Sequence, residues 1–228
     1  MPPFRQRVFA GKLYLRYSQR MADTATVRKD SARERIQDLA EAAILEKGFA
    51  ATSIEELIVA AGITKSGFFY HFKSKGELAR ALLERYLERD AEILNDLFRR
   101  ADELNDDPLH GFLVGLKMFA EMMANLPGVH PGCLTASFCY QERLFDREIQ
   151  ELNRAGLLRW RRRFRERFDL IKERYPPRVE VDLDALADMA AAIVDGGITI
   201  SKTLKDPALL PQQVLLYRQF VRAVFLPA

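Results

Sequence analysis

The sequence predicts an all-α fold of about nine helices, and three observations carry this prediction. Apolar residues recur at three- and four-residue spacing along most of the chain, which is the spacing of one helix face. Serine followed three residues later by glutamate, a helix-starting pair, occurs at Ser31, Ser53 and Ser74. No segment of any length alternates apolar and polar residues as a half-buried strand does.

The composition is that of a soluble globular protein with a sizeable core, because 48% of the 228 residues are hydrophobic and 29% are charged. The net charge of +3 is too small to indicate a nucleic-acid partner, so the evidence for one must come from where the cations lie. Cys133 and Cys139 are too few for a disulfide framework and fit a reducing compartment. No apolar run approaches the roughly 20 residues of a membrane span. We therefore expect a cytoplasmic protein without a membrane partner.

Residues 1–28 form a basic extension that we expect to be disordered. The first part of this extension carries cations but no acid. It lacks an uninterrupted apolar segment and a small-residue cleavage site, which argues against a signal peptide. Two interpretations stay open. The segment is either a disordered basic arm or the translation of an early start codon, since Met21 opens a more usual N-terminus.

The first helix is predicted over residues 32–47. Its apolar residues lie on one stripe, at Ile36, Leu39, Ala40, Ala43 and Ile44. A capping box of Ser31 with Glu34 starts the helix, and Gly48 ends it.

Two short helices follow, over residues 54–60 and 65–71. Gly62 supplies the turn between them, and Thr64 caps the second helix. Four apolar side chains face a small core shared with the first helix: Ile54, Leu57, Ile63 and Phe68. Two short helices joined by such a turn are a helix-turn-helix.

Longer apolar-periodic stretches predict the remaining helices. They cover residues 75–104, 107–125, 133–145, 147–174, 183–204 and 211–226. Breaks that contain proline separate several of them, as in the segment 126–132.

The helix-turn-helix predicts contact with DNA. In this motif the second helix enters the major groove with its N-terminal residues at the base edges. Those residues are Lys65, Ser66 and Gly67. A lysine can donate to guanine, a serine can bond either way, and a glycine lets the backbone approach closely. The helix is short because it needs to cross only one groove.

Aromatic and basic residues around this helix predict phosphate contacts. Tyr70 and His71 place polar tips beside the helix, and Lys75 adds its ammonium to the free N–H groups at the start of the next helix. The alternative is a small helical bundle with solvated lysines and buried rings. It explains each residue taken alone but not the combination.

Residues 48–78, GFAATSIEELIVAAGITKSGFFYHFKSKGEL, resemble the tetracycline-repressor (TetR) family of transcriptional regulators. The resemblance implies an all-α homodimer with a DNA-binding domain, here residues 29–75, and a ligand-binding and dimerisation domain, here residues 76–228. Carried over by position, the phosphate contacts are Thr52, Ser53, Tyr70, His71 and Lys75, the base contacts are Lys65, Ser66 and Gly67, and Thr64 and Phe69 complete the DNA-binding set.

The sequence departs from the family pattern at two positions. Phe69 stands where the family usually has a tyrosine that touches the DNA backbone, so that hydroxyl is absent and Tyr70 is the candidate to replace it. Ile58 stands where a small alanine is usual between the two helices, which predicts slightly wider packing.

The C-terminal part contains side chains suited to line a ligand pocket, although residues of this kind at helical spacing also build ordinary cores. The candidates are Phe98, Phe112, Phe119, Met122, Phe138, Glu142, Trp160 and Phe164. The segment 130–144 resembles the glycine-cysteine-leucine start of the sixth helix in one family subgroup. Cys133 there is either redox-active, with a thiolate stabilised at the helix N-terminus, or a buried and inert thiol.

Two further surfaces have alternative interpretations. The basic run of residues 159–168 is either a solvated helix face or a second DNA contact. The last two helices have small residues at 189–197 and more apolar surface than one core can absorb, which predicts the homodimer contact.

These observations predict a ligand-responsive DNA-binding regulator, and most specifically a repressor that an unknown small-molecule inducer releases from a palindromic operator. A constitutive regulator without inducer is the alternative, and a helical enzyme or adaptor is a remote one. The sequence contains few features of an enzyme active site, because its three histidines are scattered at 71, 110 and 130 and no metal-binding or phosphate-binding motif is present. We expect no metal and no cofactor.

Overall fold

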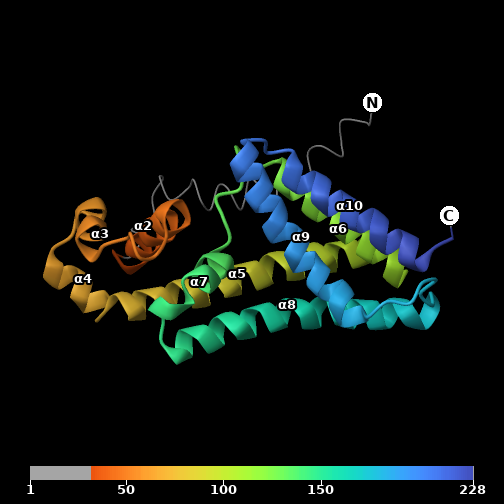
Figure 1. The fold of residues 1–228 in the computed structure, drawn as a ribbon, viewed down its shortest axis with the longest axis horizontal. Coiled ribbons are helices and arrows are strands. Elements are labelled where there is room, and N and C mark those ends of the chain that lie inside the picture. Colours follow the sequence, from red (N-terminus) through yellow and green to blue (C-terminus); the bar gives the residue numbers. More distant parts are fainter. Residues whose placement is uncertain (1–31, 228) are drawn as a thin grey trace. The chain divides into compact units, whose positions relative to one another are not determined.

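The computed structural model describes residues 32–227, which form nine α-helices, one short 3-10 helix and no strand (Figure 1). The elements are α2 (Ala32–Lys47), α3 (Ile54–Ala61), α4 (Lys65–His71), α5 (Lys75–Leu104), α6 (Pro108–Ala124), α7 (Leu134–Tyr140), η2 (Glu142–Leu144), α8 (Arg147–Arg174), α9 (Leu183–Leu204) and α10 (Leu209–Phe225). The predicted all-α fold is confirmed. None of the described helices is long and apolar enough to cross a membrane.

The predicted helix starts and stops in the N-terminal region are confirmed where the structure describes them. Ser53 Oγ accepts a hydrogen bond from the backbone N–H of Glu56 at 3.1 Å. Gly48 and Gly62 end α2 and α3 with φ angles of +88° and +62°, a backbone conformation that a side chain disfavours. The predicted capping box at Ser31, like the extension 1–28, lies outside the described residues.

The predicted helix over residues 133–145 is shorter in the structure. It ends at Tyr140, and η2 follows before Phe145 adopts an extended conformation. The physical reason is a buried aromatic ring. Phe145 is only 7% exposed and stacks on Phe138 at a centroid distance of 4.3 Å, which requires the chain to leave the helical path. Asp146 then starts α8, because its Oδ1 accepts the backbone N–H of Ile149.

The described residues pack as two compact units. The N-terminal unit comprises residues 32–91 and 131–157, and the C-terminal unit comprises residues 92–130 and 158–227. Helices α5 and α8 therefore contribute residues to both. Three short helices have little apolar surface to share, and in the N-terminal unit their core is completed by α7, Phe145 and the first turns of α5 and α8. The boundary expected at residue 75 from the family resemblance stays a prediction.

Candidate nucleic-acid interface

Two fully buried rings fix the orientation of α4. Phe68 and Phe72 are both 0% exposed, and their ring centroids lie 6.0 Å apart. Phe72 has an extended backbone, so the helix ends at His71 after 7 residues. With one side of α4 anchored in this way, the opposite side faces solvent.

Four residues form the outward face of α4: Lys65, Ser66, Phe69 and Tyr70. All four are exposed, with Phe69 at 39% and Tyr70 at 85%. Within residues 32–227, Lys65 makes no ion pair. We call this set the α4 face. It offers an ammonium, a hydroxyl, a phenyl ring and a phenol to a partner.

Two of the predicted base-reading residues, Ser66 and Gly67, take part in the cap of α4. Thr64 Oγ1 accepts the backbone N–H of Gly67 at 3.1 Å and lies 3.0 Å from the hydroxyl oxygen of Ser66. A Cβ atom at Gly67 would lie 3.3 Å from Thr64 Oγ1, so glycine gives the cap room. The packing of the cap therefore explains why position 67 is a glycine, in addition to the predicted close approach of its backbone to DNA.

His71 is half-buried, and its surroundings include a residue that sequence reasoning missed. Its ring packs edge-on against Tyr70 at 5.1 Å. Its backbone carbonyl accepts a hydrogen bond from Arg33 Nη1 at 2.7 Å, and the Arg33 guanidinium lies 4.3 Å from the centroid of the Phe72 ring. The sequence did contain a hint of this role. The positive charge of Arg33 lies at the start of α2, where it opposes the helix dipole and therefore suggests a contact elsewhere.

The two predicted phosphate residues before α3 differ in exposure. Thr52 is 1% exposed, and its hydroxyl donates to the carbonyl oxygen of Gly48 at 3.0 Å. Ser53 is exposed, with its hydroxyl oxygen at the start of α3. Nearby, Lys47 pairs with Glu56 at 2.7 Å, and this hydrogen bond lowers the pKa of the Glu56 carboxyl.

Lys75, also predicted to bind phosphate, is half-buried and contacts the turn between α2 and α3. Its ammonium donates to the carbonyl oxygen of Phe49 at 2.5 Å and lies 4.1 Å from the centroid of the Phe49 ring. Burial lowers the pKa of this ammonium. Lys75 thus braces the turn before α3, and its remaining N–H groups are what a phosphate could bind.

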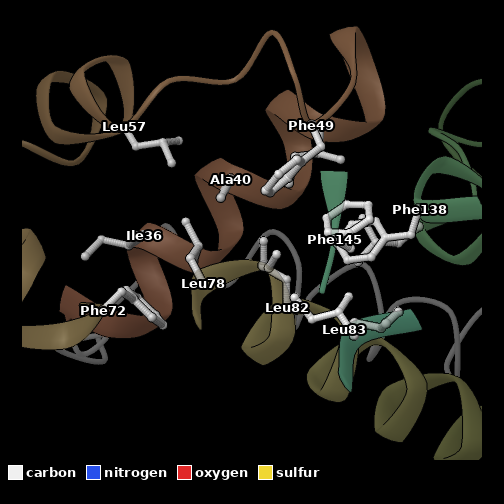
Figure 2. Close-up of a cluster of buried hydrophobic side chains, with 14 of the residues drawn as sticks. Ile36, Ala40, Phe49, Leu57, Phe72, Leu78, Leu82, Leu83, Phe138 and Phe145 are labelled. Carbon is white, nitrogen blue, oxygen red and sulfur yellow. The ribbon is translucent and has the colours of Figure 1, made fainter. Parts of the chain in front are cut away.

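The same turn packs against α7 and Phe145 through Phe49 (Figure 2). The ring of Phe49 lies 6.1 Å from that of Phe138 and 4.7 Å from that of Phe145. Gln141 adds a polar contact, because its Oε1 accepts the backbone N–H of Ala50 at 3.1 Å. A Cβ atom at Gly48 would lie 2.5 Å from Gln141 Nε2, so only glycine fits there without a shift of Gln141. Phe49 and Gln141 were missed because nothing local marks them.

A buried carboxylate ties α2 to α5. Glu41 is 7% exposed and accepts hydrogen bonds from Arg85 and Arg89, while Arg85 also pairs with Asp38 at 2.7 Å. A buried carboxylate that loses such partners strongly destabilises the fold. Together with the Phe49 contacts, this network holds the helix-turn-helix on the start of α5 within the N-terminal unit.

The predicted pocket residues fall into two clusters. In the C-terminal unit, the parallel rings of Phe98 and Phe112 lie 5.6 Å apart, and Phe164 packs edge-on against both at 5.8 Å. Trp160 stacks on Phe164, and Phe119 and Met122 are buried on α6. Phe138 belongs instead to the N-terminal unit with Phe49, and Glu142 is exposed in η2.

Cys133 occupies the N-cap of α7 in the N-terminal unit. Its sulfur accepts the backbone N–H of Ala136 at 3.4 Å and is half-buried. Burial raises the pKa of Tyr86, and a hydrogen bond between Tyr86 and Cys133 adds to the effect. The thiol is thus part of a hydrogen-bonded helix start. No cluster of three or more metal-ligating side chains occurs among the described residues.

Acidic residues of the C-terminal unit bind much of the basic run 159–168. The pairs are Arg161 with Asp188 at 2.7 and 2.6 Å, Arg165 with Asp184 at 2.8 Å, and Arg167 with Asp102 at 2.9 and 2.7 Å. Arg167 also lies 4.3 Å from the centroid of the Phe98 ring. These arginines hold α8 against its neighbours, a role that neither alternative from the sequence included.

Comparison with known proteins identifies the helix-turn-helix region. Residues 36–82 match the model of bacterial regulatory proteins of the tetR family. The transcriptional regulator AcuR of Cereibacter sphaeroides is 26% identical over 145 residues, which are 64% of each chain. The HTH-type transcriptional regulator TtgR of Pseudomonas putida is 35% identical over 79 residues, which are 34% of this chain and 35% of TtgR. The chain thus spans less than two thirds of either relative.

Solved structures share the fold over a larger part of the chain. A TetR-family transcriptional regulator from Agrobacterium tumefaciens has a TM-score of 0.71 at 18% identity, covering 87% of this chain and all of that one. The regulatory protein TetR from Rhodobacter sphaeroides has a TM-score of 0.67 at 24% identity, covering 86% of this chain and 99% of that one. The helix-turn-helix region of this chain is thus similar to that of tetR-family regulatory proteins, and the chain shares its fold with these solved structures.

Proposed function

We propose that this chain is a cytoplasmic repressor that binds a palindromic DNA operator as a homodimer and leaves it when a small molecule binds the C-terminal unit. The observation that carries the proposal is the α4 face. Lys65, Ser66, Phe69 and Tyr70 are exposed on the second helix of a helix-turn-helix, while Phe68 and Phe72 anchor its other side. A helix presented in this way can enter a major groove without any rearrangement of its core.

Exposed apolar side chains on α9 and α10 support the dimer. They are Ile200, Leu204, Leu215, Leu216 and Phe220. A Cβ atom at Gly196 would meet nothing within 4 Å, so a partner helix has room to approach α9 closely there. In a dimer formed by this surface, the two α4 helices meet successive major grooves if they lie about 34–36 Å apart or a multiple of that distance.

The inducer is the part of the proposal that draws most on the similarity to TetR-family regulators. The rings of Phe98, Phe112 and Phe164 form a buried apolar cluster in the C-terminal unit, and small-molecule sites use side chains of this kind. Helix α5 starts at Lys75, beside the helix-turn-helix, and also carries Leu94 and Phe98. A ligand that moves this helix would change the separation of the two α4 helices. Ligand and operator would then bind antagonistically, with a typical coupling of ~1–3 kcal/mol that is equal in both directions.

Two measurements test the proposal. The first selects bound fragments from the source organism's DNA and measures the affinity of the recovered sequences against random duplex as salt is varied. Retention that is equal for both duplexes would overturn specific operator binding. The second titrates candidate inducers into the free protein and into the operator complex. Equal inducer affinity in the two titrations would leave a constitutive regulator, and specific binding would still stand.

A further inference from the structure

The phenyl ring of Phe69 is the apolar part of the α4 face. It is 39% exposed and packs edge-on against the buried ring of Phe68, with centroids 5.4 Å apart. Lys65 lies four residues earlier, and residues at this spacing are neighbours on one side of a helix. The ring therefore lies on the same side of the helix as Lys65, and it packs against Phe68.

The chemistry of the ring limits what it can bind on DNA. A phenyl group has neither a hydrogen-bond donor nor an acceptor, so it has no polar attraction for a phosphate oxygen or for the heteroatoms of a base edge. The major groove presents one apolar group for such a ring, the C5 methyl of thymine. The exposed phenol of Tyr70, directly after Phe69, is by contrast suited to a phosphate oxygen.

We propose that Phe69 reads a thymine, and that its ring packs on the C5 methyl of one thymine in each operator half-site, adjacent to the base pair that Lys65 contacts. The inference rests on the proposed function. Single exposed apolar residues are ordinary on protein surfaces, as Val59 on α3 illustrates at 81% exposure. What distinguishes Phe69 is its position beside Lys65 on the helix that enters the groove.

The experiment removes the methyl group and leaves the protein unchanged. In the selected operator, each thymine is replaced in turn by deoxyuridine, which pairs identically and lacks only the C5 methyl. For the full-length protein, one position per half-site should lose about fourfold in affinity, the effect of one methyl-sized apolar contact, and about sixteenfold when both half-sites are changed. The other thymines should tolerate the replacement.

Two variants assign the effect to its side chain. Phe69→Ala should bind the thymine and deoxyuridine operators with equal affinity. Val59→Ala, which truncates an exposed apolar side chain on the neighbouring helix, should keep the full difference. Melting temperatures close to that of the wild type show that both variants are folded, and the deoxyuridine scan of the wild type needs no variant at all.

The outcomes separate this inference from the proposed function. A wild-type protein that binds its operator specifically but tolerates deoxyuridine everywhere would overturn the role of Phe69 and leave the regulator intact. A methyl dependence that persists in Phe69→Ala would assign the thymine to another side chain, which also overturns the inference. Failure to prefer any duplex over random DNA would instead remove the proposed function itself.

Discussion

Two cationic regions of this protein differ in whether their charges are already bound. Residues 159–168 carry six arginines, and at least three of these are held by carboxylates of the C-terminal unit. The α4 face carries only Lys65, which has no ion pair within the described part of the chain. An arginine that binds DNA must first give up its carboxylate, whereas a lysine in water exchanges only solvent and counterions. The number of cations in a run is therefore a poor guide to how many of them remain available to a partner.

Among the substitutions that test this comparison, Lys65→Ala should have the largest effect on DNA binding. We expect a loss of roughly 1–3 kcal/mol on the best operator and a relaxed preference at one base pair per half-site, since lysine donates to a base edge. Binding assays on the operator and on random duplex measure both. Arg162→Ala, at an exposed position of the basic run, is the matched control and should change neither value. Equal losses for Lys65→Ala on both duplexes would make Lys65 a phosphate contact.

The next effect is expected from Lys75→Ala. If a phosphate binds its ammonium, affinity should fall for all sequences alike, and the slope of log K against log salt should fall by about one for each subunit. The brace between Lys75 and Phe49 predicts a lower melting temperature as well. A lower melting temperature with an unchanged salt slope would leave Lys75 only this structural role.

A third prediction concerns Asp107, which binds the end of α8. Its carboxylate accepts hydrogen bonds from the backbone N–H of His110 at 2.9 Å and from the hydroxyl of Tyr175 at 2.7 Å, and it pairs with Arg174 at 3.1 Å. Burial alone would raise the pKa of Asp107, but these bonds and the His110 ring hold it well below its usual value.

We expect Asp107→Ala to lower the free energy of unfolding by roughly 1–2 kcal/mol at pH 7, because a helix cap and an ion pair are lost. A carboxyl with a depressed folded-state pKa stabilises the fold above its unfolded pKa of about 3.9 and loses this effect as pH falls through the folded value. The difference between variant and wild type should therefore shrink below about pH 4. Denaturant titrations across this range measure it, and a difference independent of pH would contradict the assignment.

The smallest effect is expected from Arg167→Ala. Loss of its pair with Asp102 and of its contact with the Phe98 ring should cost about 1 kcal/mol of stability. The salt dependence of DNA binding should not change, because this charge is already bound within the C-terminal unit. A reduced salt slope would mean that the basic run does contact DNA, and it would contradict the proposed difference between the paired arginines of this run and Lys65.

Most of the fold could be predicted from the sequence because its signals are local. The stripe of Ile36, Ala40 and Ile44 gave α2, and the cap at Ser53 together with Gly62 gave the helix-turn-helix. The end of α7 at Tyr140 could not be predicted in this way. Residues 133–145 carry a helical pattern throughout, and the interruption places Phe145 against Phe138 and also against Phe49, which is distant in sequence.

The outward face of α4, the candidate DNA-binding site, could also be predicted in large part. The exposure of Lys65, Ser66, Phe69 and Tyr70 agrees with the pattern, since Phe68 and Phe72 are anchors at helical spacing. The position of Lys75 agrees less well. A lysine in the first turn of a helix can reach solvent or a nearby carbonyl oxygen, and only the folded turn at Phe49 decides between them.

The sequence by itself determined most of the helix boundaries, the helix-turn-helix and the outward face of α4, because periodicity and caps act within a few residues of one another. The tertiary structure alone decided which charges remain for a partner. Arg167 meets Asp102 across 65 positions, and Gln141 reaches Ala50 across 91. Such pairings depend on which helix faces pack together. The apolar pattern states that each helix has a buried face but not which neighbour covers it, so the charges beside that face find their partners only when the core is assembled.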